Sequence, residues 1–141
     1  MKPIHSFKTL VWWSETDAAG IMHFSSIFKL CEWAEEDFIK KLTGKTFKEA
    51  TAHRIIFPRV HASCDFIKPL YAHEEAKVNI TSISLGKSSI TWIFDVYNES
   101  RGYLAAKCKI VTVAVDRFQM KSVEIPKDIR DLLEKAGASN R

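Results

Sequence analysis

The chain has 141 residues, of which 46% are apolar and 27% are charged. This length suits one domain, and this composition allows a buried core and excludes an intrinsically disordered chain. The net charge of +4 comes from lysines and arginines that are scattered rather than clustered, so we expect no nucleic-acid partner. A mildly basic surface would instead attract a small ligand that carries phosphates.

The start of the chain and its cysteines indicate a cytoplasmic protein. Residues 1–5 lead into alternating polar and apolar positions and lack the apolar block of a signal peptide or membrane span, so we expect no membrane association. Cys31, Cys64 and Cys108 are widely spaced in apolar surroundings, which predicts core thiols rather than disulfides. The histidines show no spacing typical of a metal site. They are His5, His23, His53, His61 and His73.

The first part of the chain predicts a strand, a loop and a long helix. Residues 7–13 alternate in polarity, as a strand does, and residues 14–22 have the composition of a loop. A helix is predicted from Ser25 or Ser26, either of which can cap its first N–H groups, to about Gly44. Its apolar positions recur at spacings of three and four. They are Ile27, Leu30, Cys31, Ala34, Phe38 and Leu42.

The rest of the chain predicts more strands and a short helix. Residues 60–66 alternate in polarity, and three further strands, separated by short turns, cover 76–85, 89–97 and 103–115. A terminal helix starts at Ile125–Pro126. Its predicted buried side is Ile129, Leu132 and Leu133, and Gly137 ends it. Since no repeat or linker interrupts residues 1–141, we predict a single α+β domain with a curved antiparallel sheet of about five strands around one long helix.

The segment from Trp13 to Phe28 resembles the signature of the 4-hydroxybenzoyl-CoA thioesterase family, the hot-dog-fold acyl-CoA thioesterases. In that signature an aspartate, two residues, a glycine and a short apolar run precede the central helix. The resemblance extends to residues 56–69, to residues 85–89 and to the order of the strands. It implies a hot-dog fold and an enzyme that hydrolyses an acyl-CoA, with no cofactor beyond the coenzyme A of its substrate.

The same resemblance, carried over by position, implies the site residues. Asp17 would act as general base or as nucleophile, and the backbone N–H of Phe24 would polarise the thioester carbonyl from the positive end of the helix. Gly20 would permit a tight turn or a positive φ that brings the loop to the helix. Trp13 and His23 would flank the substrate.

Substrate contacts are also implied at a hairpin. The resemblance places Lys87, Ser88 and Ser89 near the pantetheine or phosphate end of coenzyme A, where an ammonium or backbone N–H groups can bind phosphate. The aryl-specific branch of the family has an aromatic residue at the position of Phe24. The acyl group therefore remains open between aromatic and aliphatic, and the thiol carrier between coenzyme A and acyl carrier protein.

Three alternatives stay open at the level of sequence. Asp17 could only close an Asx-turn, as loop aspartates commonly do. A hot-dog hydratase or dehydratase would use His23 as its base with help from a helix glutamate such as Glu32. A non-catalytic acyl-CoA-binding module would keep the fold without the reaction. The helix glutamates Glu32, Glu35 and Glu36 otherwise predict a solvated face, with one of them a candidate for the wall of a pocket.

In the hot-dog fold two subunits pair their sheets edge to edge, and the site lies between them. The resemblance therefore implies a homodimer or a homotetramer built from two dimers. Such pairing would also cover the free edge of an isolated sheet.

Overall fold

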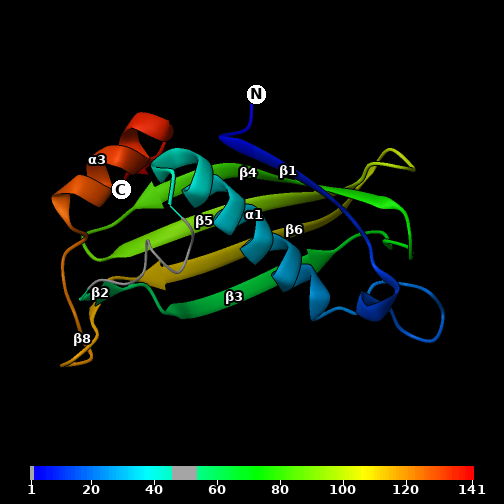
Figure 1. Ribbon diagram of the computed structural model, residues 1–141, viewed down its shortest axis with the longest axis horizontal. Helices are drawn as coiled ribbons and strands as arrows, with labels where there is room; N and C mark the ends of the chain where they lie inside the picture. The colour runs from blue at the N-terminus through cyan, green and yellow to red at the C-terminus, as the bar shows by residue number, and fades with distance from the viewer. Residues whose placement is uncertain (1, 46–53) are drawn as a thin grey trace.

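The computed structural model describes residues 2–45 and 54–141. One long helix, α1 (Ser26–Thr43), lies across one face of a curved sheet whose strand order is β1–β4–β5–β6–β3 (Figure 1). The neighbouring strands on this path pair antiparallel, and β9 adds to β4 in parallel. The five main strands are β1 (His5–Leu10), β3 (Arg59–Phe66), β4 (Glu75–Leu85), β5 (Ser89–Asn98) and β6 (Tyr103–Val113). The predicted α+β hot-dog arrangement is confirmed.

Shorter elements complete the chain. A 3₁₀ helix, η1, follows β1, and a second, three-stranded sheet has the order β2–β7–β8. The bounds are η1 (Trp13–Glu15), β2 (Ile55–Ile56), β7 (Val115–Asp116), β8 (Lys121–Ser122), α3 (Lys127–Ala136) and β9 (Ser139–Asn140). The small sheet and its β7–β8 hairpin were not predicted from the sequence.

The core lies between α1 and the sheet. The predicted apolar stripe of α1 is buried except for Leu42, which is partly exposed. Phe38 of this stripe meets Trp92 of β5 edge to face, with 6.0 Å between ring centroids. The helix ends at Gly44, whose φ of +74° is the left-handed conformation that commonly follows a last turn.

The predicted start of α1 is right, but the predicted capping is wrong. Ser25 stands at the N-cap in a helical conformation, and its side chain makes no capping hydrogen bond. Its hydroxyl lies 2.8 Å from Nδ1 of His23, while the hydroxyl of Ser26 donates to Glu15. Both serine hydroxyls therefore tie the start of the helix to the preceding loop.

The first strand begins and ends earlier than predicted, at His5 and Leu10. β1 ends at Leu10, and Val11 is buried and hydrogen-bonds through its N–H to Glu74 and through its carbonyl to the N–H of His73. Trp13 then enters the 3₁₀ helix and is 61% exposed. Trp12 and Trp13 both lie on the surface, so the apolar residues after Leu10 extended the predicted strand without being buried in it.

β3 forms one edge of the large sheet, which explains its exposure. Val60 and Phe66 were predicted on an apolar face, yet they are 61% and 54% exposed, and a bulge interrupts the pairing with β6 between Arg59 and His61. An edge strand has a neighbour on one side only, so its side chains gain less cover. Within the described residues this edge of β3 is unpaired.

Two further differences concern the C-terminal part. β6 stops at Val113, and after Ala114, whose N–H donates to the carbonyl of Ser88, the chain continues as β7 beside β2. α3 begins after Pro126 and ends before Gly137, as predicted. Leu133 of this helix is buried, but Leu132 is 38% exposed, contrary to its prediction.

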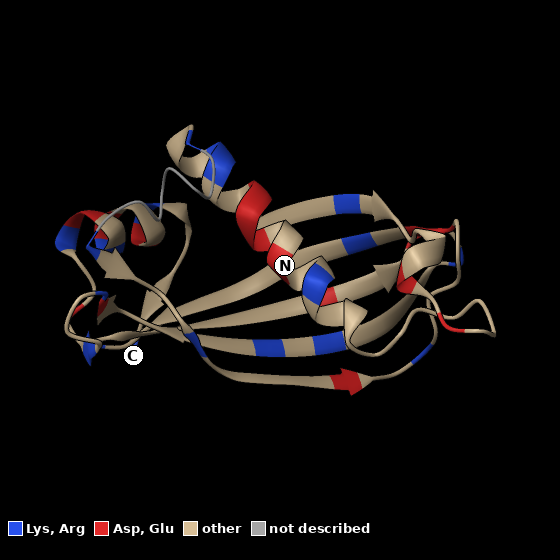
Figure 2. Cartoon of the chain, turned by 60° about the horizontal axis from the view of Figure 1, so that its bottom comes forward, with Lys and Arg blue, Asp and Glu red and all other residues tan. Residues whose placement is uncertain are grey.

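The predictions about cysteines, basic residues, membrane spans and metal sites can be compared with the structure. All three cysteines are free thiols, with Cys31 and Cys108 buried and Cys64 half-buried. Figure 2 shows lysine and arginine positions spread over the sheet, both helices and the loops. No helix among the described residues is long and apolar enough to cross a membrane. The same residues contain no cluster of metal-binding side chains, and His53 lies outside them.

Candidate active site

The loop between η1 and α1 is closed by a tight turn at Asp17. The N–H of Asp17 donates to the carbonyl of Ile21 at 2.8 Å, and the N–H of Gly20 donates to the carbonyl of Asp17 at 3.0 Å. Gly20 has φ +76°, a conformation that costs a side-chain-bearing residue free energy, so the predicted positive φ is present. Bridges from Ile21 to Tyr71 and from Thr16 to Met22 fix the turn to its surroundings.

The carboxylate of Asp17 is exposed and only half engaged. Its Oδ1 accepts hydrogen bonds from the N–H of Ala19 at 2.8 Å and of Ile21 at 3.3 Å. These bonds form an Asx-turn, which is the purely structural role that the sequence also allowed for Asp17. Among the described residues no group donates to Oδ2, so one oxygen holds the turn and the other is available for chemistry.

The N–H of Phe24 is the free donor at the start of α1. The neighbouring N–H groups are used: His23 donates to the carbonyl of Glu15, Ser26 to that of His23, and Ile27 weakly to that of Phe24 at 3.4 Å. No described residue accepts from the N–H of Phe24. A free N–H at a helix N-terminus, with the helix dipole behind it, can stabilise negative charge on an oxygen.

Glu15 fixes the start of α1 next to this donor, a role that the sequence analysis did not predict. Its carboxylate accepts from the Ser26 hydroxyl at 2.6 Å and pairs with Lys29 at 3.2 Å, so it joins η1 to the first turn of α1. The hydrogen bond from Ser26, aided by Lys29, lowers the pKa of Glu15 below its usual value. No regular spacing in the sequence links position 15 to positions 26 and 29.

An apolar cavity of about 330 Å³ opens beside Phe24. Its walls come from the Asp17 loop, the first turn of α1 and the segment that follows β3. They include Ile21, Phe24, Ile27, Phe66, Ile67 and Lys68. Ile21 belongs to the turn that carries Asp17, so this turn, the free N–H and the cavity lie at the same end of the sheet, although Asp17 itself does not line the cavity.

The other predicted residues of this loop contribute surface. Trp13 lies near Gly20, where an added Cβ would be 4.0 Å from its ring. The ring of His23 stacks on that of Phe24 at 4.7 Å between centroids, and its Nδ1 accepts from the N–H of Ser25 at 3.3 Å. His23 is exposed, and no hydrogen bond within the described chain joins it to Glu32, which pairs with Arg59.

The hairpin residues Lys87, Ser88 and Ser89 do not lie at this end within one subunit. The loop that carries Asp17 follows Leu10, which pairs with Glu75 at the start of β4, whereas the hairpin follows Leu85 at its end. The intervening strand spans roughly 33 Å at about 3.3 Å per residue. Figure 1 shows the loop and the hairpin at opposite ends of the sheet.

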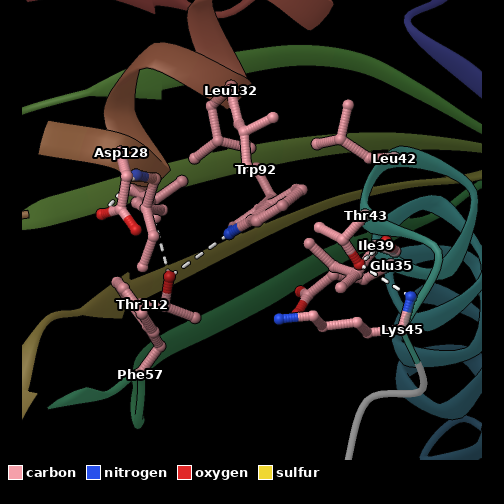
Figure 3. Close-up of a pocket in the computed structure, with 13 residues that line it drawn as sticks. Glu35, Ile39, Leu42, Thr43, Lys45, Phe57, Trp92, Thr112, Asp128 and Leu132 are labelled. Carbon is pink, nitrogen blue, oxygen red and sulfur yellow. Dashed lines mark hydrogen bonds between the residues drawn. The ribbon is translucent and has the colours of Figure 1, made fainter. Parts of the chain in front are cut away.

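A second, larger cavity of about 430 Å³ lies near the hairpin end (Figure 3). Leu42 of α1, Trp92 of β5 and Leu132 of α3 surround it. Glu35 also faces it and is buried, so it is the helix glutamate that lines a pocket, whereas Glu32 and Glu36 are exposed as predicted. Burial raises the pKa of Glu35, and the charge and hydrogen bonds of Arg59 oppose that rise.

A curved antiparallel sheet around one long helix, with an aspartate turn in the loop before that helix, is the arrangement of the hot-dog-fold thioesterases. Comparison with known families agrees: the thioesterase-like superfamily matches residues 11–133. The chain belongs to this superfamily, and the protein is a thioester hydrolase.

Individual relatives are moderately similar. A 1,4-dihydroxy-2-naphthoyl-CoA hydrolase of Crocosphaera subtropica is 30% identical over 97 residues, which cover 67% of this chain and 69% of that protein. The structure of a gentisyl-coenzyme A thioesterase has a TM-score of 0.77 and 26% identity, with 89% and 98% of the two chains covered. A 1,4-dihydroxy-2-naphthoyl-CoA thioesterase from Synechocystis has a TM-score of 0.83 at 19% identity, covering 92% and 94%, and shows the shared fold.

Proposed function

We propose that this acyl-CoA thioesterase cleaves aromatic acyl-CoA thioesters, with Asp17 as its reactive carboxylate. The observation that carries the proposal is the free N–H of Phe24 at the mouth of an apolar cavity, next to the turn that presents Oδ2 of Asp17. The aromatic acyl group is supported by the names of two relatives, which act on a dihydroxynaphthoyl and a gentisyl thioester. A flat ring also suits walls built from Phe24, Phe66 and Ile67.

The chemistry follows from these groups. The thioester carbonyl accepts a hydrogen bond from Phe24 N–H, which stabilises the negative charge that develops on its oxygen. Oδ2 of Asp17 then either deprotonates a water that attacks the carbonyl carbon or attacks that carbon itself to give a mixed anhydride. In both routes the coenzyme A thiolate leaves and takes up a proton that comes from water. In the second route a water then hydrolyses the mixed anhydride, which releases the free acid and regenerates the Asp17 carboxylate.

The working enzyme in this proposal is a dimer that pairs β3 with β3 of a second copy. The edge of β3 is unpaired within the described residues and carries the exposed apolar residues Val60 and Phe66. The cavity beside Phe24 is walled by Phe66 and Ile67 at the end of this strand, so it lies at the interface. Two such dimers could associate further into a tetramer.

The same pairing would supply the coenzyme A contacts. In a dimer whose two-fold axis passes through the middle of β3, the two β3 strands run antiparallel. The hairpin end of one sheet then lies beside the Asp17 end of the other. Lys87, Ser88 and Ser89 would therefore meet the phosphates of a substrate bound at Asp17 of the partner subunit. A cytoplasmic location is also part of the proposal and is supported by three free thiols, two of which, in Cys64 and Cys108, face each other at 3.0 Å.

The test is release of free thiol from benzoyl-CoA, a naphthoyl-CoA and straight-chain acyl-CoA thioesters, with wild type and Asp17→Asn. Removal of a general base or nucleophile should lower kcat by at least about 10²-fold, with aromatic substrates the best for wild type. His23→Ala, in the same loop, is the comparison variant and should retain most of the wild-type kcat, because His23 is predicted to contact the substrate and not to carry out the reaction.

Two results would contradict the proposal. Full thiol release by Asp17→Asn would contradict the role of Asp17, and conversion of an unsaturated acyl-CoA without thiol release, lost in His23→Ala, would favour the hydratase alternative. Tight binding of benzoyl-CoA by a folded protein that releases no thiol from any substrate would favour a binding module.

A further inference from the structure

The tip of the β7–β8 hairpin exposes two large apolar side chains. Phe118 is 74% exposed and Met120 is 66% exposed, more than any other large apolar residue of the described chain. Adjacent apolar side chains this far out in solvent commonly mark a surface that another molecule covers. Neither residue has a role in the site described above.

This tip is rigidly built. Oδ1 of Asp116 accepts from the N–H of Phe118 at 2.9 Å and of Gln119 at 3.2 Å, and its carbonyl accepts from the N–H of Met120 at 2.7 Å. Arg54 donates to Oδ2 of Asp116 at 2.6 Å and also lies 5.5 Å from the Phe118 ring centroid. These contacts hold Phe118 in its exposed position, so little entropy would be lost when it contacts a partner.

The hairpin projects past the β3 edge. Arg59 at the start of β3 pairs with Thr112 of β6, and β7 begins at Val115, so the hairpin continues beyond the start of β3. Figure 1 shows the β8 hairpin beyond the start of β3, at the lower left of the view. Phe66 and Ile67, which wall the cavity beside Phe24, lie at the opposite end of the same strand.

We propose that the Phe118–Met120 tip of each subunit closes the active-site cavity of the other. The inference rests on the dimer of the proposed function. In an antiparallel pair of β3 strands related by a two-fold axis, the start of one strand lies beside the end of the other. A tip that extends beyond the start of β3 therefore lies beside Ile67 of the partner subunit and over its cavity.

The chemistry of the tip suits this position. Phe118 adds an aromatic wall to an apolar cavity, and Met120 can adapt its shape to an aromatic acyl group and exclude water from it. The tip thus contacts the acyl part of the substrate, while Asp17 and Phe24 of the other subunit contact the thioester. Each site would be incomplete in a lone subunit.

The test is a heterodimer that combines Asp17→Asn in one subunit with Phe118→Asp in the other, co-expressed with two tags and purified through both. If the tip acts across the dimer, one site keeps both Asp17 and an intact tip, so benzoyl-CoA turnover should reach about half that of wild type. The Phe118→Asp homodimer should lose about tenfold in kcat/KM. Ser122→Asp adds the same charge to the exposed strand β8 of the same hairpin, outside the tip, and should leave kcat/KM near the wild-type value.

A cysteine pair tests the placement without reference to catalysis. Phe118→Cys combined with Ile67→Cys should give a covalent dimer on oxidation, whereas Phe118→Cys with Leu10→Cys, at the opposite sheet edge, should not. A heterodimer no more active than one Phe118→Asp site, or no cross-link in a folded dimer, would overturn the proposal. Activity that survives Asp17→Asn together with a formed cross-link would contradict the role of Asp17 and still support the tip.

Discussion

Gly20 is the residue whose backbone makes the Asp17 turn possible. An added Cβ would meet only the Trp13 ring at 4.0 Å, so Gly20→Ala introduces strain through its φ of +76° rather than through a clash. We expect a loss of about 1 kcal/mol in the free energy of unfolding. We also expect kcat to fall about tenfold, because the altered turn displaces the Asp17 carboxylate.

The control is Gly102→Ala. Gly102 has the same φ of +76° and nothing within 4 Å of an added Cβ, but it lies in the β5–β6 turn. It should lose similar stability in thermal unfolding and keep the wild-type kcat for thiol release. Equal losses of kcat in both variants would show that Gly20 affects activity only through global stability.

The candidate site was predictable where its residues are contiguous. Asp17, Gly20 and Phe24 fall within one short segment, so a sequence signature contains their relative positions. Glu15 was not predictable as the group that fixes Phe24, because its contact with Ser26 exists only after η1 has turned the chain back toward α1. The roles of Asp17 and Phe24 themselves remain predictions.

At the level of elements, Arg59 joins the edge strand to the central helix through two ion pairs, with Glu32 and with Glu35. Glu35 of α1 is buried and pairs with Arg59 of β3 at 3.1 Å. Burial raises the pKa of Glu35 above its usual value in spite of Arg59. The folded state therefore holds this proton more tightly than the unfolded state, so the associated stability is present below the unfolded pKa of Glu35 and is lost as pH rises through the folded one.

Glu35→Gln tests the predicted direction in which stability changes with pH. The amide keeps a hydrogen-bond acceptor for Arg59 but cannot ionise, so the variant should lack the part of the stability loss that wild type shows as pH rises above the usual glutamate range. Glu36→Gln, at an exposed position of the same helix, is the control and should follow the wild-type profile. The measurement is urea unfolding across pH; a Glu35→Gln profile parallel to that of wild type would contradict the assignment.

The elements themselves were predicted unevenly, for physical reasons. The sequence predicted α1 well, because the spacing of its apolar residues and the residues at its two ends lie within the helix segment itself. Strand ends depend on partners: β1 stops where Val11 bonds to the 73–74 turn, and β3 is exposed because it lies at an edge. The small sheet β2–β7–β8 pairs two-residue strands, which are too short to give a pattern.

For the whole molecule, the proposed dimer makes activity depend on protein concentration. Ala62 lies near the middle of β3 and is exposed. Ala62→Asp would place two like charges close together across the two-fold axis, which costs several kcal/mol, so we expect the dimer Kd to rise by about 10²-fold. Ser6→Asp adds the same charge to exposed β1 at the opposite edge and should leave the Kd unchanged.

Sedimentation and thiol release over the same dilution series decide between two roles of the second subunit. If the partner supplies the hairpin and Lys87–Ser89, the specific activity of Ala62→Asp should fall in step with its dimer fraction and recover at high concentration. A dissociated variant with undiminished activity would show that Asp17, Phe24 and one cavity suffice. Because the cavity beside Phe24 opens at the β3 edge, a lone subunit would leave its acyl group in water, and we therefore expect the two curves to coincide.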